Sequence, residues 1–160
     1  TSTIPKQAKG GILMTLLFIL FALLAGAIVT FQIGINSQLQ LFLNNSVQAT
    51  LVSFSIGTIA LFLYSVIANY DWPTLQQALQ TPWWIWTGGI LGAVYVFATI
   101  FLAPKLGATV LIGLIIAGQL ITSLILDHYG FLGFPQQAIN PWRILGVIFL
   151  IIGVVLIRSN

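Results

Sequence analysis

The stretch that decides the fold runs from residue 12 to residue 38 and reads ILMTLLFILFALLAGAIVTFQIGINSQ. It contains no charged residue and exceeds the roughly 20 apolar residues that cross a bilayer as a helix. Four more apolar segments follow, at about 47–68, 83–103, 108–126 and 143–157, the last near the lower limit for a span. The sequence therefore predicts an all-α integral membrane protein with five transmembrane helices.

The composition excludes several classes of protein. Hydrophobic residues make up 59% of the chain and charged residues 4%, and the mean hydropathy is +1.07. A soluble domain is about a quarter charged, so an ordinary soluble domain, a disordered chain and a nucleic-acid binder are all excluded. The five basic residues are scattered, so the net positive charge says nothing about an anionic partner. We predict one membrane domain over residues 1–160, with the lipid bilayer as its surroundings.

The segments between the spans carry signals of their own. Lys6 and Lys9 precede the first apolar run as in a signal peptide, but the run continues to Ile35, so we expect a retained spanning helix. The linker 69–82 is the longest polar stretch and predicts a short interfacial helix that starts at Pro73. The tryptophans at 83, 84 and 86 are typical of the aromatic belt at the headgroup level. Residues 104–107 predict a tight turn, and glycines and prolines mark 127–142 as a loop.

Five spans place the two ends of the chain on opposite sides. Side A, with the N-terminal end, the 69–82 linker and the 127–142 loop, carries Lys6, Lys9 and Arg143; side B carries Lys105 and Arg158. An imbalance of three against two is a weak orientation signal. We therefore expect the chain to insert both ways and to pair head to tail with itself. The alternative is that Lys6 and Lys9 suffice to hold the N-terminal end inside.

Small residues recur in nearly every span, and in lipid they allow helix backbones to approach closely. The glycines that we expect to pack against other helices are Gly26, Gly34, Gly57, Gly88, Gly92 and Gly113. They could equally let helices slide or bend during a transport cycle.

The few polar side chains inside the spans are informative, because each must find a partner or line a wet cavity. Gln32 and Asn36 are four residues apart and share one face of the first span, while Tyr95 and Gln119 lie inside the third and fourth spans. One hypothesis is that these four residues form a polar substrate site, which would suit a neutral or zwitterionic solute. The alternative is that the amides make interhelical hydrogen bonds that hold the fold together.

No acidic residue lies in the middle of a span. Asp127 ends the fourth span beside His128, and both are candidates for a gating or coupling role, since histidine changes charge near neutral pH. A salt bridge in the loop, with Arg143 as partner, is the alternative. With one His, two Asp and no Glu or Cys, the chain offers no catalytic constellation, no metal site and no cofactor motif, so we do not expect an enzyme.

Several motifs together resemble the YdcZ family of the drug/metabolite transporter superfamily. These motifs are Gln32-x-x-x-Asn36, Ser53-Phe54-x-x-Gly57-Thr58, Pro82-Trp83-Trp84-x-Trp86-x-Gly88-Gly89-x-x-Gly92-Ala93-x-Tyr95-Val96, Pro104-Lys105-Leu106-Gly107-Ala108, Ala117-Gly118-Gln119-Leu120, Asp127-His128-Tyr129-Gly130 and Arg143-Ile144-x-Gly146. The resemblance covers about residues 20–157.

The resemblance implies a five-helix half-transporter of a prokaryotic inner membrane. Larger relatives contain ten helices as two inverted repeats, so two antiparallel copies would rebuild a ten-helix bundle. Smaller exporters of the superfamily carry a glutamate in their first helix, where this chain has Gln32 and Asn36, and this departure argues against multidrug cation/proton exchange. We expect a secondary transporter of a small metabolite or drug-like solute. A flippase of lipid-linked substrates and a non-transporting membrane scaffold are the alternatives.

Overall fold

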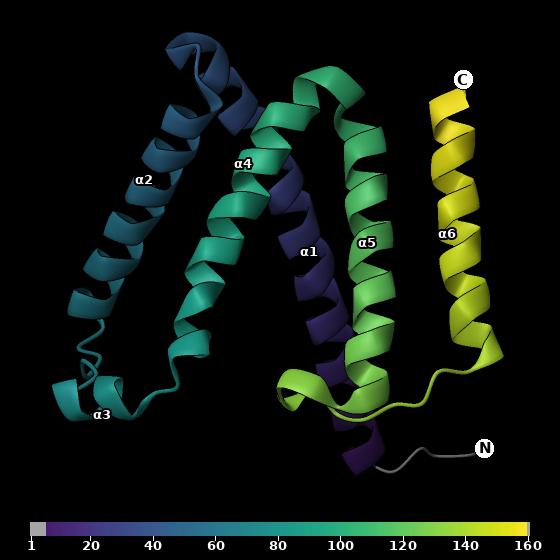
Figure 1. The fold of residues 1–160 in the computed structure, drawn as a ribbon. Coiled ribbons are helices and arrows are strands. Elements are labelled where there is room, and N and C mark those ends of the chain that lie inside the picture. The colour runs from purple at the N-terminus through teal and green to yellow at the C-terminus, as the bar shows by residue number, and fades with distance from the viewer. Residues whose placement is uncertain (1–5, 160) are drawn as a thin grey trace.

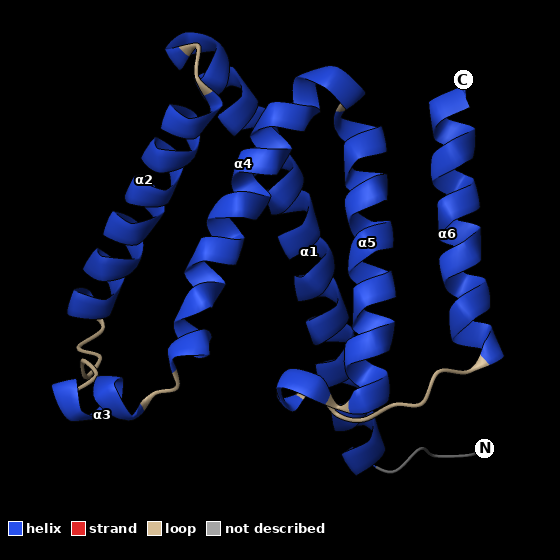
Figure 2. Cartoon of the chain, viewed as in Figure 1, coloured by secondary structure: helices blue, strands red, loops and turns tan. Residues whose placement is uncertain are grey.

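The structure, a computed structural model, describes residues 6–159 and the side chains of residues 11–158. Its elements are α1 (Lys6–Leu43), α2 (Ser46–Ile67), α3 (Leu75–Gln80), the 3-10 helix η1 (Trp83–Thr87), α4 (Gly88–Leu106), α5 (Ala108–Tyr129), the 3-10 helix η2 (Phe131–Gly133) and α6 (Pro141–Ser159). Figure 2 shows only helices and loops in this part of the chain. Five of the described helical segments are long and apolar enough to cross a membrane, as the sequence predicts.

The long helices run up and down, so connections gather at the two ends of the bundle. The start of α1, the short helix α3 and the loop between α5 and α6 lie at one end in Figure 1. The α1–α2 and α4–α5 connections and the end of α6 lie at the other end. This distribution agrees with the predicted sides A and B.

Local signals explain where the helices begin. The Asn45 side chain accepts hydrogen bonds from the backbone N–H groups of Val47 and Gln48, which caps the start of α2. A capping box between Thr74 and Gln77 starts α3 at Leu75, two residues after the predicted start at Pro73.

Several predicted boundaries differ from the structure. α5 continues past Leu126 to Tyr129, so Asp127 and His128 lie in its last turn and not in the loop, and α6 begins at Pro141, two residues before Arg143. α1 continues past Gln38 to Leu43, because the chain contains no helix-breaking residue before Asn44, whose φ is 51°. Pro104, expected in a turn, lies in the last turn of α4, and the turn falls on Gly107 with φ 77°. A proline near a helix end removes one hydrogen bond without ending the helix at once, whereas a positive φ favours glycine.

The helices pack with little buried area. α1 contacts α2, α4 and α5, and α6 contacts α5 alone among the described elements. The core cluster consists of Ala49, Val96 and Ile100, with Leu39, Phe54 and Tyr95 packed around it. Most large apolar side chains are exposed, as expected of a chain whose solvent is lipid.

Two of the six predicted packing glycines touch another helix of the same chain. A Cβ at Gly92 would meet the Phe54 ring at 3.5 Å, and a Cβ at Gly113 would lie 2.5 Å from Val154 Cγ2. The other four face open space within one chain: Gly26, Gly34, Gly57 and Gly88. For these four, a packing role stays a prediction about contacts beyond the single chain.

Candidate functional site

Tyr95 and Gln119 come together where two grooves meet. The central groove, about 480 Å³, lies between α1, α4 and α5 and is lined by Gly26, Val29, Thr30, Ile33, Tyr95, Ile112, Ile115, Ile116 and Gln119. The α4–α5 groove, about 440 Å³, is lined by Tyr95, Leu114, Ile115, Gly118, Gln119, Thr122 and Ser123. Tyr95 is half-buried and Gln119 is exposed. Two of the four predicted site residues therefore share one place.

Asn36 lies one helical turn from Ile33, which lines the central groove. Asn36 is 5% exposed, and its side chain forms no hydrogen bond within the described residues. One turn further along α1, Gln40 Oε1 is the one buried side-chain oxygen or nitrogen without a hydrogen-bond partner among the described residues. A buried acceptor without a partner is costly, so a donor from outside the single chain would be favoured at Gln40.

Gln32 lies apart from the other three candidates. It is exposed and lines none of the grooves described here. Gln32 and Asn36 differ by only about 40° around the helix axis, but Gln32 lies one turn nearer the N-terminal end, where its side chain is exposed. Four-residue spacing from Asn36 therefore does not bring Gln32 into the same surroundings.

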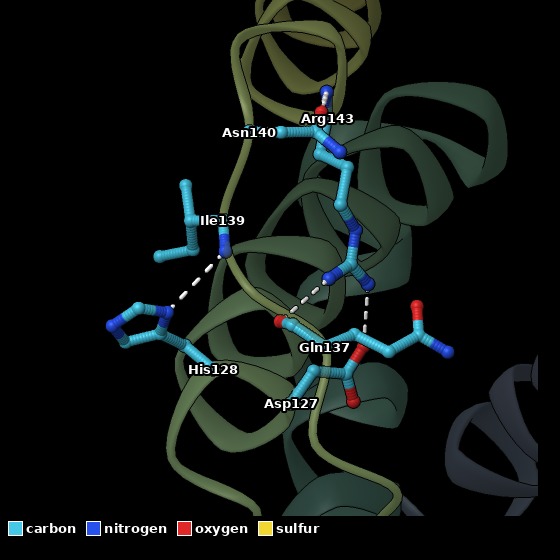
Figure 3. Close-up of polar contacts among 6 residues, drawn as sticks. All are labelled: Asp127, His128, Gln137, Ile139, Asn140 and Arg143. Carbon is cyan, nitrogen blue, oxygen red and sulfur yellow. Dashed lines mark hydrogen bonds and ion pairs between the residues drawn. The ribbon is translucent and has the colours of Figure 1, made fainter.

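Asp127 and Arg143 form the ion pair that the sequence suggested. Arg143 Nη2 donates to Asp127 Oδ2 at 2.5 Å, and Arg143 Nη1 donates to the carbonyl oxygen of Gln137 at 3.2 Å (Figure 3). Both side chains of the ion pair are partly buried, at 27% and 21% exposed for Arg143 and Asp127. The backbone carbonyl of Asp127 also accepts from Gly130 and Gln137. These bonds tie the start of α6 and the intervening loop to the end of α5.

His128 faces the loop and makes contacts of its own. Its Nδ1 accepts a hydrogen bond from the backbone N–H of Ile139 at 3.3 Å, as Figure 3 shows. Its carbonyl oxygen accepts from Gln136 Nε2 at 3.1 Å. Asp127 and His128 thus hold the same loop through different atoms.

Three further groove residues, Thr122, Ser123 and Arg143, were not predicted as such from the sequence. A third groove of about 300 Å³, the α5–α6 groove, is lined by Leu120, Ser123, Leu124, Arg143, Gly146 and Val147. The spacing of Gln119, Thr122 and Ser123, at three and four residues, is the signal that could have placed them on one face of α5. The described residues contain no cluster of three His, Asp, Glu or Cys that could hold a metal ion.

Comparison with known proteins finds one protein family whose model matches most of the chain. The family model described as "Putative inner membrane exporter, YdcZ" matches residues 17–156. The chain is 38% identical over 79 residues to the inner membrane protein YdcZ of Escherichia coli (strain K12). That alignment spans about half of each protein, at 49% of this chain and 52% of the relative.

No solved structure matches the chain significantly. The family match nevertheless covers most of the chain, including every groove residue named above. Together with its five apolar helices, the match identifies the chain as a multi-pass inner-membrane protein that belongs to the YdcZ family of the drug/metabolite transporter superfamily.

Proposed function

We propose that the chain is a secondary transporter that moves a small metabolite or drug-like solute by alternating access, as a homodimer of oppositely oriented copies. The observation that carries the proposal is the junction of two grooves at Tyr95 and Gln119. The family's description as an inner-membrane exporter supports transport in general.

The position of the junction suits a transport site. Gln119 is in the middle of α5, and polar residues at that depth of a membrane helix face a cavity or a partner in most proteins. Secondary transporters bind their substrates near the bilayer midplane. A tyrosine hydroxyl and an amide offer donors and acceptors without net charge, so we propose that they bind the polar part of a neutral or zwitterionic solute.

Gln32 and Asn36 support the dimer. A primary amide exposed to hydrocarbon is unfavourable, and Gln32 is exposed on the apolar helix α1. A further groove of about 550 Å³ lies on α1, lined by Ala27, Thr30, Phe31, Gly34, Ile35 and Gln38. Neither Gln32 nor Asn36 lines this groove, so we propose that a second, antiparallel copy covers both the groove and the exposed face with Gln32, and that Gln32 and Asn36 of both copies complete the site.

The contacts of Asp127 and His128 support a gating role at side A. They hold the loop between α5 and α6 across one end of the bundle. Exchange of these contacts for water or solute would free the start of α6, which contacts no other described helix than α5. We propose that this release accompanies opening on side A.

The test is uptake into sealed membrane vesicles. A panel of labelled amino acids, sugars and dyes is screened first for uptake above that of vesicles without the protein. Asn36→Ala and Gln119→Ala should then reduce uptake of the selected solute to the background level, with an unchanged amount of cross-linked dimer.

Gln76→Ala is the matched control, because Gln76 lies in α3 outside the spans. It should leave uptake unchanged. Loss of dimer together with uptake in Asn36→Ala and Gln119→Ala would show that the amides are structural. Absence of uptake for the whole panel, with dimers present, would favour a scaffold.

A further inference from the structure

The three grooves described above connect along one face of α5. Tyr95 and Gln119 belong to both the central groove and the α4–α5 groove, and Ser123 belongs to both the α4–α5 groove and the α5–α6 groove. The polar side chains along this face are Gln119, Thr122 and Ser123, and Arg143 lies at its far end. Polar side chains among apolar neighbours therefore mark a route from the middle of α5 through connected grooves to Arg143 on side A.

The length of this route matches half of a membrane. α5 continues for ten residues from Gln119 to its end at Tyr129, which corresponds to about 15 Å at 1.5 Å per residue. The hydrocarbon core is about 30 Å thick, so one chain provides a route between the midplane and one surface. In an antiparallel pair, the second copy would provide the matching route to the other surface.

The end of the route carries a positive charge. Arg143 is the one charged residue that lines any of the four grooves described within residues 11–158. Asp127, its partner, lines none of them, so the ion pair presents its positive end to the α5–α6 groove. In surroundings of low dielectric constant such an oriented pair attracts anions and repels cations.

We propose that this face of α5 is a hydrated half-path from Tyr95 and Gln119 to side A, and that Arg143 makes it selective for solutes that carry a carboxylate or a phosphate. The inference rests on the proposed transport function and changes its substrate class from neutral or zwitterionic solutes to zwitterions and anions with an apolar body. Thr122 and Ser123 are the positioning residues of the path, and their hydroxyls replace water around the moving solute.

Accessibility of introduced cysteines tests the path, since the natural chain has no cysteine. Ser123→Cys and Ile121→Cys are compared in purified protein in nanodiscs of zwitterionic lipid. The probes are two methanethiosulfonates of similar size, the anionic sulfonatoethyl and the cationic trimethylammonioethyl reagent. Ile121 is the matched control because it lies at the same depth, is 45% exposed and lines none of the grooves.

The cysteine at position 123 should react, and the cysteine at position 121 should not. Relative to the same reagents at Gln76→Cys in α3, the anionic reagent should be favoured at position 123 by about tenfold, the low end of what charged clefts achieve. Adding Arg143→Gln should abolish this preference, and adding Arg158→Gln should leave it unchanged. Equal reaction at positions 121 and 123, or a preference that survives Arg143→Gln, would overturn the proposal.

Two further variants, Arg143→Lys and Asp127→Asn, distinguish the loss of positive charge from misfolding of Arg143→Gln. Both keep a positive charge at the groove, so the anionic preference should persist in both. A preference lost in Arg143→Lys would show that the ion pair is structural and would overturn the selectivity. These measurements need no transported solute. The proposed path can therefore be contradicted while the uptake screen identifies a solute, and it can be supported while the screen finds none.

Protection experiments distinguish a soluble anion from a lipid headgroup. N-acetylphenylalanine, an anion, should slow modification of Ser123→Cys, whereas phenylalaninamide, a cation, should not. If phosphatidylglycerol nanodiscs give the same protection without added solute, an anionic lipid headgroup occupies the path and the proposed soluble substrate class is wrong.

Discussion

Gly113 of α5 lies against Val154 of α6, in the only interface that α6 makes with another described element. An added Cβ would lie 2.5 Å from Val154 Cγ2, so either the Val154 side chain or the two helices would have to shift. We expect Gly113→Ala to lower the free energy of unfolding by about 1–3 kcal/mol, the usual cost of overpacking. The measurement is thermal or denaturant unfolding of the purified protein in detergent.

Gly153→Ala is the control at the same scale, because a Cβ at Gly153 of α6 would meet nothing within 4 Å. It should be neutral or slightly stabilising. Val154→Ala in the Gly113→Ala background should recover part of the loss by removing the clashing methyl groups. Equal stability of the two alanine variants would contradict the α5–α6 packing described here.

At the scale of elements, the antiparallel arrangement of α4 and α5 depends on one residue. Gly107 joins them with φ 77° and ψ 154°, a combination that is essentially restricted to glycine. Gly107→Ala should therefore cost about 1–3 kcal/mol of unfolding free energy. It should also reduce modification of Ser123→Cys, because a displaced α5 no longer aligns its polar face with Tyr95.

Gly89→Ala separates this effect from the loss of a glycine as such. Gly89 lies in the first turn of α4, and a Cβ there would meet nothing within 4 Å. Alanine at a helical position should be neutral or stabilising by up to about 1 kcal/mol. If Gly107→Ala were equally harmless, the turn would tolerate a different geometry and α5 would not be fixed by it.

At the scale of the whole molecule, the charge imbalance between the two sides is too small to favour one orientation in the membrane strongly, with three Lys or Arg on side A and two on side B. Reporter tags at both ends should be found on both sides of the membrane in a bacterium. Lys6→Gln with Lys9→Gln should place side A outside, and Lys105→Gln with Arg158→Gln should place it inside. Each orientation-biased variant alone should lose uptake, and the two expressed together should restore it.

Expression of two variants with the same orientation is the control, and it should not restore uptake. A single orientation of the unmodified chain would contradict dual insertion. The chain would then need a parallel pair or an oppositely oriented partner chain.

The number of spans, the two ends of the bundle and the YdcZ resemblance were readable from the sequence alone. Hydropathy is a local property, and about 20 apolar residues predict a span whatever its neighbours are. The Asp127–Arg143 pair was also predictable as an alternative, because the loop between these two residues is short and few other charges are available to them. The sequence also predicted Tyr95 and Gln119 as candidate site residues, since polar residues are rare inside spans.

Only the tertiary structure decided which of these polar residues share a place. Gln32 and Asn36 have ideal spacing for one face, yet Asn36 is buried and Gln32 is exposed, because burial depends on where α2, α4 and α5 cross α1. The same reason explains Ser123, an ordinary residue in the sequence that joins two grooves in the fold. Helical spacing specifies a direction around one axis, and the neighbouring helices determine what lies in that direction.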